Sequence, residues 1–162
     1  MASRTYVVST GGITLVNAVC TLVWINPGTS VSLEILRMWA SQSANATSNQ
    51  QRVQTNTQVT AFPTLTSATP RKTNFSDQVS AIVGATNGAA GTAGTNASAE
   101  GAGTKSLIIE DAFNVLNGWL HVPTPLETQM MNAGAASGWG LHFPVAALSL
   151  TNWATGIIYR EL

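Results

Sequence analysis

Charged residues are scarce in this chain of 162 residues: they make up 9% of it, with seven Lys or Arg against seven Asp or Glu, and the formal net charge is zero. Nucleic-acid phosphates and anionic membrane surfaces are bound by clustered positive charge. We therefore expect neither a nucleic acid nor a membrane as a partner. Solubility must come from the abundant neutral polar residues, a composition typical of closely packed extracellular or particle-borne β-proteins.

Cysteine is nearly absent, and the single Cys20 excludes an intrachain disulfide. It lies in an apolar run, which predicts a small buried side chain rather than a reactive thiol. The N-terminus shows no hydrophobic signal region. The longest apolar run, residues 13–25, is interrupted by polar residues and is too short to span a bilayer. We expect synthesis in the cytoplasm.

Residues with catalytic chemistry are few and scattered. The two histidines, His121 and His142, have no third metal ligand nearby in the sequence. No Gly-X-Ser-X-Gly motif is present. Glu110 and Asp111 are adjacent, so on a strand they point to opposite faces and do not form the paired carboxylates of a glycosidase. Residues 101–106 resemble a phosphate-binding loop, but Thr104 stands where that motif needs glycine. The sequence predicts no enzyme, with no catalytic residue, metal or cofactor.

Short β-rich segments separated by Gly, Pro and Asn, without a helical pattern, predict an all-β fold. We expect one domain over residues 1–162: a jelly-roll β-sandwich of about eight antiparallel strands. Residues 1–12, which include a candidate strand at 4–9, could form an N-terminal arm. Residues 84–104 consist almost entirely of Gly, Ala, Thr, Asn and Ser and predict a long surface loop, ordered by a neighbouring molecule.

Residues 13–25 predict a strand that is apolar on both faces. Such a strand either lies in the centre of a sandwich or has an outer face that meets another subunit. For the second case we predict intersubunit contacts by one face of this strand together with the segment around Trp139. The predicted interface residues are Val16, Ala18, Leu22, Trp24, Trp139 and His142.

Three other strands have a readable pattern. Residues 31–42 carry Val31, Leu33, Ile35 and Trp39 on one face. Residues 50–60 alternate without a clear apolar face, which predicts an edge strand or an exposed one. In residues 152–159, Trp153, Ile157 and Tyr159 share one face, and Ile158 lies on the other.

The last third of the chain has three short segments that each carry a tryptophan: residues 118–125, 138–144 and 151–159. Exposed tryptophans can stack on the apolar face of a sugar ring. Large aromatic residues in a sandwich are more often core or interface anchors. We interpret these tryptophans as strand anchors.

Several phrases of the sequence resemble a family of small virion proteins of tailed bacteriophages. They are Trp39-Ala-Ser-Gln-Ser43, Gln50-Gln-Arg-Val53, the Thr-rich segment 60–70, residues 96–101, Gly118-Trp-Leu-His-Val-Pro-Thr-Pro125 followed by Glu127, Gly140-Leu-His-Phe-Pro144 and Leu150-Thr-Asn-Trp153. The resemblance spans roughly residues 31–162. It is to the decoration proteins, also called cement or auxiliary proteins, which form trimers of tumour-necrosis-factor-like jelly rolls on the capsid.

This resemblance implies a structural protein of the virion, made in the host cytoplasm and located on the capsid surface. It implies a homotrimer that binds the major capsid protein and stabilises the head, with no catalytic residues to carry over. Two alternatives remain: a tail or fibre module or small coat protein of the same fold, and a carbohydrate-binding jelly roll that uses exposed Trp and His side chains.

Overall fold

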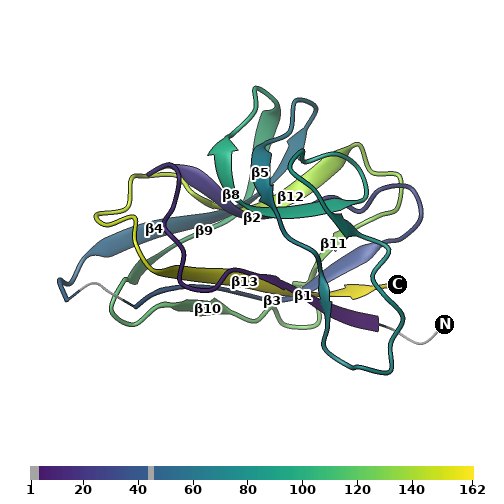
Figure 1. The fold of residues 1–162 in the computed structure, drawn as a ribbon, viewed down its shortest axis with the longest axis horizontal. Coiled ribbons are helices and arrows are strands. Elements are labelled where there is room, and N and C mark those ends of the chain that lie inside the picture. Colours follow the sequence, from purple (N-terminus) through teal and green to yellow (C-terminus); the bar gives the residue numbers. More distant parts are fainter. Residues whose placement is uncertain (1–3, 44–45) are drawn as a thin grey trace.

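The computed structural model describes residues 4–43 and 46–162, and they form a β-sandwich of two sheets packed face to face (Figure 1). The all-β prediction is confirmed: these residues contain no helix, and nearly all strand pairs are antiparallel. It follows that no helix in the described part of the chain could cross a membrane.

Sheet A has the strand order β10-β3-β13-β1-β6, with β11 also pairing with β3. Its strands are β1 (Arg4–Ser9), β3 (Leu33–Gln42), β6 (Arg71–Lys72), β10 (Trp119–His121), β11 (Gln129–Met131) and β13 (Trp153–Glu161). Sheet B has the order β5-β8-β2-β12-β4-β9, with β7 beside β8. Its strands are β2 (Cys20–Ile25), β4 (Gln50–Val59), β5 (Thr64–Ser67), β7 (Val83–Gly84), β8 (Thr92–Ala99), β9 (Thr104–Asn114) and β12 (Ser137–Phe143).

The core lies between the two sheets and follows the two-residue period of the strands. In β13 the inward side chains are Trp153, Ile157 and Tyr159, all fully buried, as the sequence predicts. Trp153 packs edge-on against Phe143 of β12, with ring centroids 4.8 Å apart, and Phe113 of β9 contacts both rings. Burial of one large apolar side chain stabilises a fold by about 1.5–3 kcal/mol, so this aromatic cluster fastens β9, β12 and β13 together.

The N-terminal residues do not form an arm where they are described. Residues 4–9 are strand β1, which pairs with β13 along its whole length and with β6 at Tyr6 and Val7. The side chains of Tyr6 and Val8 are buried in the core, which explains why this segment stays on the sheet. Residues 1–3 of the predicted arm lie outside the described part of the chain.

The predicted strand over residues 13–25 is wrong for its first half, because β2 begins at Cys20. Asn96 binds the irregular segment that precedes β2. Its Oδ1 accepts a hydrogen bond from the Val16 amide at 3.0 Å, and its Nδ2 donates to the Thr14 carbonyl at 3.0 Å. Asn17 in turn donates to the Ser98 carbonyl at 2.8 Å. These asparagine side chains satisfy backbone groups that a strand ladder would otherwise use.

Strand β2 is buried on both faces within one protomer. Val23 and Ile25 face the core, whereas Trp24 lies on the other face in a separate cluster with Phe62 and Leu65. The Trp24 indole N–H donates to the Gly88 carbonyl at 3.0 Å. Of the two explanations for its apolar faces, a central position is therefore the correct one for β2.

The prediction of a long loop over residues 84–104 is also wrong. This stretch contains β8, which pairs with β2, β5 and β7 and is buried from Thr92 to Ala97. Its small residues permit close packing: a Cβ on Gly94 would lie 2.7 Å from the Leu65 Cβ and 3.0 Å from the Ala85 carbonyl oxygen. The low hydrophobicity of residues 84–104 reflects small side chains that pack closely around Trp24, and not a lack of structure.

Strand β4 is an interior strand, contrary to the prediction of an edge strand or an exposed one, since it pairs with β12 on one side and β9 on the other. Its alternate residues are buried although many are polar. The Gln58 amide donates to the carbonyls of Ala61 (2.9 Å) and Glu100 (3.0 Å), and Gln51 donates to the Val145 carbonyl (3.1 Å). Hydrogen bonds to loop carbonyls allow these amide side chains to be buried.

We expect Trp24→Ala to lower the free energy of unfolding by about 3–5 kcal/mol, because it leaves a cavity beneath Phe62 and removes the bond to Gly88. Phe75→Ala is the matched control: Phe75 is 93% exposed, so we expect a change within about 0.5 kcal/mol. Chemical denaturation of both variants measures the difference. Similar stabilities for the two would contradict the two-sided burial of β2.

Candidate functional site

Most of the predicted interface residues lie inside the protomer. The side chains of Leu22, Trp24 and Trp139 are fully buried, and that of His142 is 6% exposed. They therefore have no surface to offer a second subunit, and this part of the prediction is wrong. Val16 is exposed and Ala18 half-buried in the segment before β2, where an intersubunit contact stays a prediction.

His142 belongs to a polar cluster on the outer side of sheet B. The Glu100 carboxylate accepts hydrogen bonds from the amide (2.5 Å) and hydroxyl (2.7 Å) of Thr21 on β2. It also pairs with Lys105 of β9 at 2.5 Å, and its Oε2 lies 3.4 Å from Nδ1 of His142 on β12. The cluster joins the connection between β8 and β9 to the middle of the sheet.

At neutral pH the counterion of Glu100 is Lys105 and not His142. Burial and the nearby Lys105 charge lower the pKa of His142 to about 4, against the opposing influence of Glu100. The hydrogen bonds from Lys105 and Thr21 lower the pKa of Glu100 despite its burial. The imidazole is therefore neutral and the carboxylate ionised over the physiological range.

Cys20 is adjacent to this cluster but is inert, as the sequence predicts. The thiol is fully buried, and burial raises its pKa to about 12, with a further contribution from Glu100. A thiolate is the nucleophilic form of cysteine, so this group is not suited to nucleophilic catalysis.

The second histidine, His121, lies on β10, on the side of the sandwich where β10 approaches β9. His121 stacks on Trp119 with ring centroids 5.8 Å apart, and the Trp119 indole donates to Asp111 at 2.9 Å. This bond crosses from one sheet to the other. Glu110 points elsewhere, toward Arg52 and Gln54. In residues 4–43 and 46–162 no three His, Cys, Asp or Glu side chains gather in a way that could hold a metal ion.

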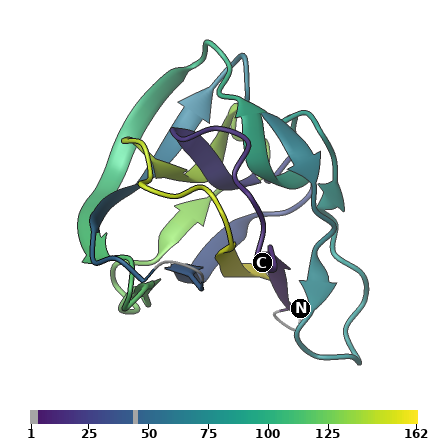
Figure 2. The same ribbon diagram turned by 60° about the vertical axis from the view of Figure 1, so that its left-hand side comes forward.

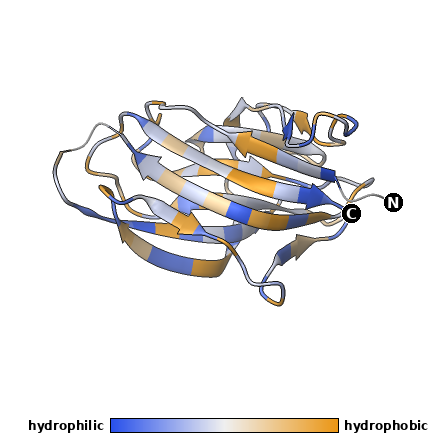
Figure 3. Ribbon diagram, turned by 90° about the horizontal axis from the view of Figure 1, so that it is seen from below, coloured by the Kyte–Doolittle hydropathy of each residue, from blue (hydrophilic) through white to orange (hydrophobic). Residues whose placement is uncertain are grey.

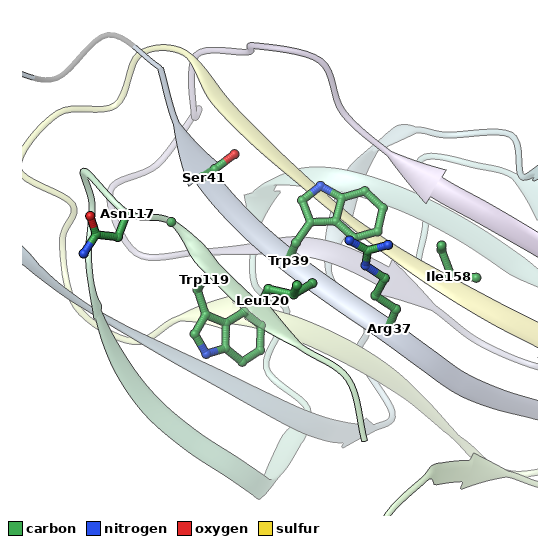
Figure 4. Close-up of a pocket in the computed structure, with 8 residues that line it drawn as sticks. Arg37, Trp39, Ser41, Asn117, Trp119, Leu120 and Ile158 are labelled. Atoms are coloured by element: carbon green, nitrogen blue, oxygen red, sulfur yellow. The ribbon is translucent and has the colours of Figure 1, made fainter. Parts of the chain in front are cut away.

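The outer face of sheet A carries an apolar surface instead. The strand register places Leu120 of β10 opposite Trp39 of β3, and Ile158 of β13 opposite both Val7 of β1 and Arg37 of β3. Trp39, Leu120, Ile158 and Arg37 line an open hollow of about 420 Å³ (Figure 4). We call Val7, Trp39, Leu120 and Ile158 the face patch.

Two details describe the surroundings of Trp39 in the face patch. Gly156 on β13 lies beneath Trp39, where an added Cβ would overlap the indole ring. The ring can therefore lie across the sheet rather than stand away from it. Arg37 at the margin is exposed, and no carboxylate of the described residues pairs with it. Viewed from this side, hydrophobic and hydrophilic segments alternate along the strands (Figure 3).

A second apolar surface lies at the edge of the sandwich. Ile108 of β9, Leu126 and Met130 line a hollow of about 360 Å³ between β9 and the chain that leads into β11. Leu126 is 99% exposed, and the other two are at least partly exposed. Among the strands of the described residues β9 pairs with β4 alone, so its outer backbone edge is open to them. We call Ile108, Leu126 and Met130 the edge patch.

Sequence reasoning missed both patches. It placed Trp39 on the same face as Leu33 and Ile35, but the pairing of β3 with β13 shifts by one residue between Ile158 and Tyr159. This irregularity turns Trp39 outward while Leu33 and Ile35 stay in the core. The alternation in residues 152–159 correctly placed Ile158 on the face opposite to Trp153, Ile157 and Tyr159.

We expect the wild type to lose stability as the pH falls from about 6.5 to about 4. Between those values the unfolded chain binds a proton at His142 that the folded chain does not. Protonation of Glu100, whose pKa is lowered by folding, adds a loss at still lower pH. His142→Asn should flatten the upper part of this curve, measured by chemical denaturation at stepped pH.

The matched control for this pH dependence is His121→Asn, which leaves the Glu100 cluster intact and should keep the slope due to His142. If His142→Asn and the wild type show the same slope between pH 6.5 and 4, the neutral buried state of His142 is wrong.

Comparison of the chain with protein-family models, with curated proteins and with solved structures finds no match.

Proposed function

We propose that the protein is a structural component of a virion, a capsid decoration protein that acts as a homotrimer on the major capsid protein. The observation that carries the proposal is the pair of separate apolar surfaces, the face patch and the edge patch, on a chain with 9% charged residues. Exposed apolar patches mark surfaces that are covered in an assembly. The sequence resemblance to phage decoration proteins supplies the identity of that assembly.

The order of strands supports the finer assignment of a jelly roll. Leaving aside β5, β6, β7 and the eight-residue β8, the chain visits sheets A, B, A, B, B, A, B and A in turn, with β10 and β11 counted as one strand. The resulting orders, β1-β13-β3-β10 and β2-β12-β4-β9, are those expected when a long antiparallel hairpin is rolled into two sheets. The described residues form 13 strands, and the predicted number of about eight is reached only for this reduced set.

The two patches lie on different elements, which favours head-to-tail contacts. In such a contact the edge of one protomer packs on the face of the next, and a ring closes if the rotation allows it. In the face patch the Trp39 ring lies against Gly156, and in the edge patch Leu126 is 99% exposed. A closed trimer would cover the open edge of β9, which is otherwise a site for unwanted strand pairing.

A second candidate, a carbohydrate-binding domain, is favoured by one feature of the same surface. Trp39 is half-buried beside Arg37, Ser41 and Asn117, which line the hollow of about 420 Å³. An aromatic ring with neighbouring polar groups can hold a sugar. Glycan binding by a stable monomer, lost on Trp39→Ala, would favour this candidate over the trimer.

We expect the wild type to sediment as a trimer of the 16.9 kDa chain. Ile158→Arg in the face patch and Leu126→Asp in the edge patch should each weaken association by about tenfold or more, as buried interface anchors do. Analytical ultracentrifugation over a range of concentrations measures this. Leu148→Asp, an exposed leucine in neither patch, is the matched control and should remain trimeric.

Mixing the two variants tests the head-to-tail arrangement. Ile158→Arg retains a good edge and Leu126→Asp retains a good face, so a mixture should form a heterodimer at concentrations where neither variant assembles alone. A trimer that survives both substitutions, or a wild-type monomer at every concentration, overturns the proposed assembly.

A further inference from the structure

The connection from β6 to β7, residues 73–82, presents an aromatic side chain to solvent. Phe75 is 93% exposed and Val79 is 76% exposed. The loop projects beyond the sandwich on the side of the N-terminus (Figure 2), and none of its residues belongs to either patch. An apolar ring held in water contributes nothing to the core, so its position needs another explanation.

This loop is fixed at its beginning and in its middle by hydrogen bonds to β1. The amide (3.1 Å) and hydroxyl (2.9 Å) of Thr73 both donate to the Thr5 carbonyl. The Tyr6 hydroxyl donates to the Gln78 carbonyl at 3.0 Å, and Arg4 donates to the Gln78 side chain at 2.9 Å. The loop is therefore bound to the sheet on both sides of Phe75.

The end of the loop is fixed by the buried Glu161 of β13. Its Oε1 accepts hydrogen bonds from the Ser80 hydroxyl at 2.6 Å and from the Ala81 amide at 3.0 Å. At the tip, the Asn74 carbonyl accepts from the Asp77 amide at 3.1 Å. A loop ordered in this way pays little conformational entropy when it binds a partner, and a rigid exposed aromatic is the usual anchor of a protein interface.

Unpaired positive charge surrounds the base of the loop. Arg4, Arg71 and Lys72 are three of the seven basic residues of the chain, and they lie on the paired strands β1 and β6. No carboxylate of the described residues forms an ion pair with any of them. Asp77 is the one acidic residue between positions 71 and 84. With Asp77 and the buried Glu161 at the end of the loop both counted, this corner carries three cations against two carboxylates, and this small positive excess favours an acidic partner surface.

We propose that residues 73–82 form a docking loop that inserts Phe75 into an apolar pocket on another protein, with acidic side chains around that pocket facing Arg4, Arg71 and Lys72. The inference rests on the proposed function, which makes this partner the capsid shell protein. A protein is favoured over a membrane because Asp77 sits two residues from Phe75, and its carboxylate would be repelled by anionic headgroups. Three cations are also too few for a nucleic-acid surface.

The test uses empty shells of the phage that encodes this chain, assembled without it, and the full-length protein in a co-sedimentation assay. Phe75→Ala should weaken binding to the shells at least tenfold, with the oligomer mass and the unfolding curve unchanged. Lys72→Glu should weaken binding and reduce its dependence on salt. Leu148→Ala, which removes an exposed leucine outside the loop, is the matched control and should bind like the wild type.

The outcomes separate the two proposals. If the wild type binds and Phe75→Ala binds equally well, the docking loop is wrong and the decoration function stands. If the wild type does not bind the shells, both proposals fall. If it instead binds phosphatidylserine vesicles in a manner that requires Phe75, the loop is a membrane anchor, and the protein partner is overturned.

Discussion

The structure depends on the burial of β2 from both sides. Its inner residues complete the aromatic core between the sheets, and Trp24 on its outer side requires a second layer. That layer is built from Phe62, Leu65 and the small residues of β8, with the Gly88 carbonyl accepting the indole N–H. Without this cover a tryptophan at the centre of sheet B would be exposed to water. The Gly- and Ala-rich part of the chain is therefore a structural requirement of the sheet and not a spacer.

Buried polar groups on the outer side of sheet B follow the same constraint. Burial of β4 and β12 on their outer side brings Gln58, Glu100 and His142 out of water, and each must find a partner or lose its charge. Glu100 keeps its charge because Lys105 and Thr21 stabilise it, whereas His142 gives up its proton because burial and Lys105 oppose a second positive charge. The cluster connects the segment between β8 and β9 to the sheet. Cys20 beside it is a neutral thiol, and His142, the group that could act as a base, is buried.

Three of the apolar surfaces that the sandwich leaves exposed are the face patch on sheet A, the edge patch beside β9 and the Phe75 side chain within residues 73–82. They lie on different parts of the described chain, and other exposed apolar side chains, such as Leu148, lie outside them. This arrangement fits the proposed role in surface contact, because rigid, pre-positioned apolar groups lose little entropy on assembly. The low charge of the chain suits the same task, since few ionic groups have to be desolvated when surfaces meet.

The sequence by itself determined the fold class, because turn residues and period-two alternation are local properties. It placed Trp153, Ile157 and Tyr159 on one face. It also indicated that Cys20 is buried and unreactive and that the chain has no intrachain disulfide. Only the tertiary structure decided which apolar faces are covered within the chain. A one-residue shift beside β3 turned Trp39 outward, Asn96 replaced half of a predicted strand ladder, and close packing converted a low-complexity stretch into β8. These outcomes depend on residues far apart in the sequence, and a pattern read along the chain carries no information about which distant segment will supply the cover.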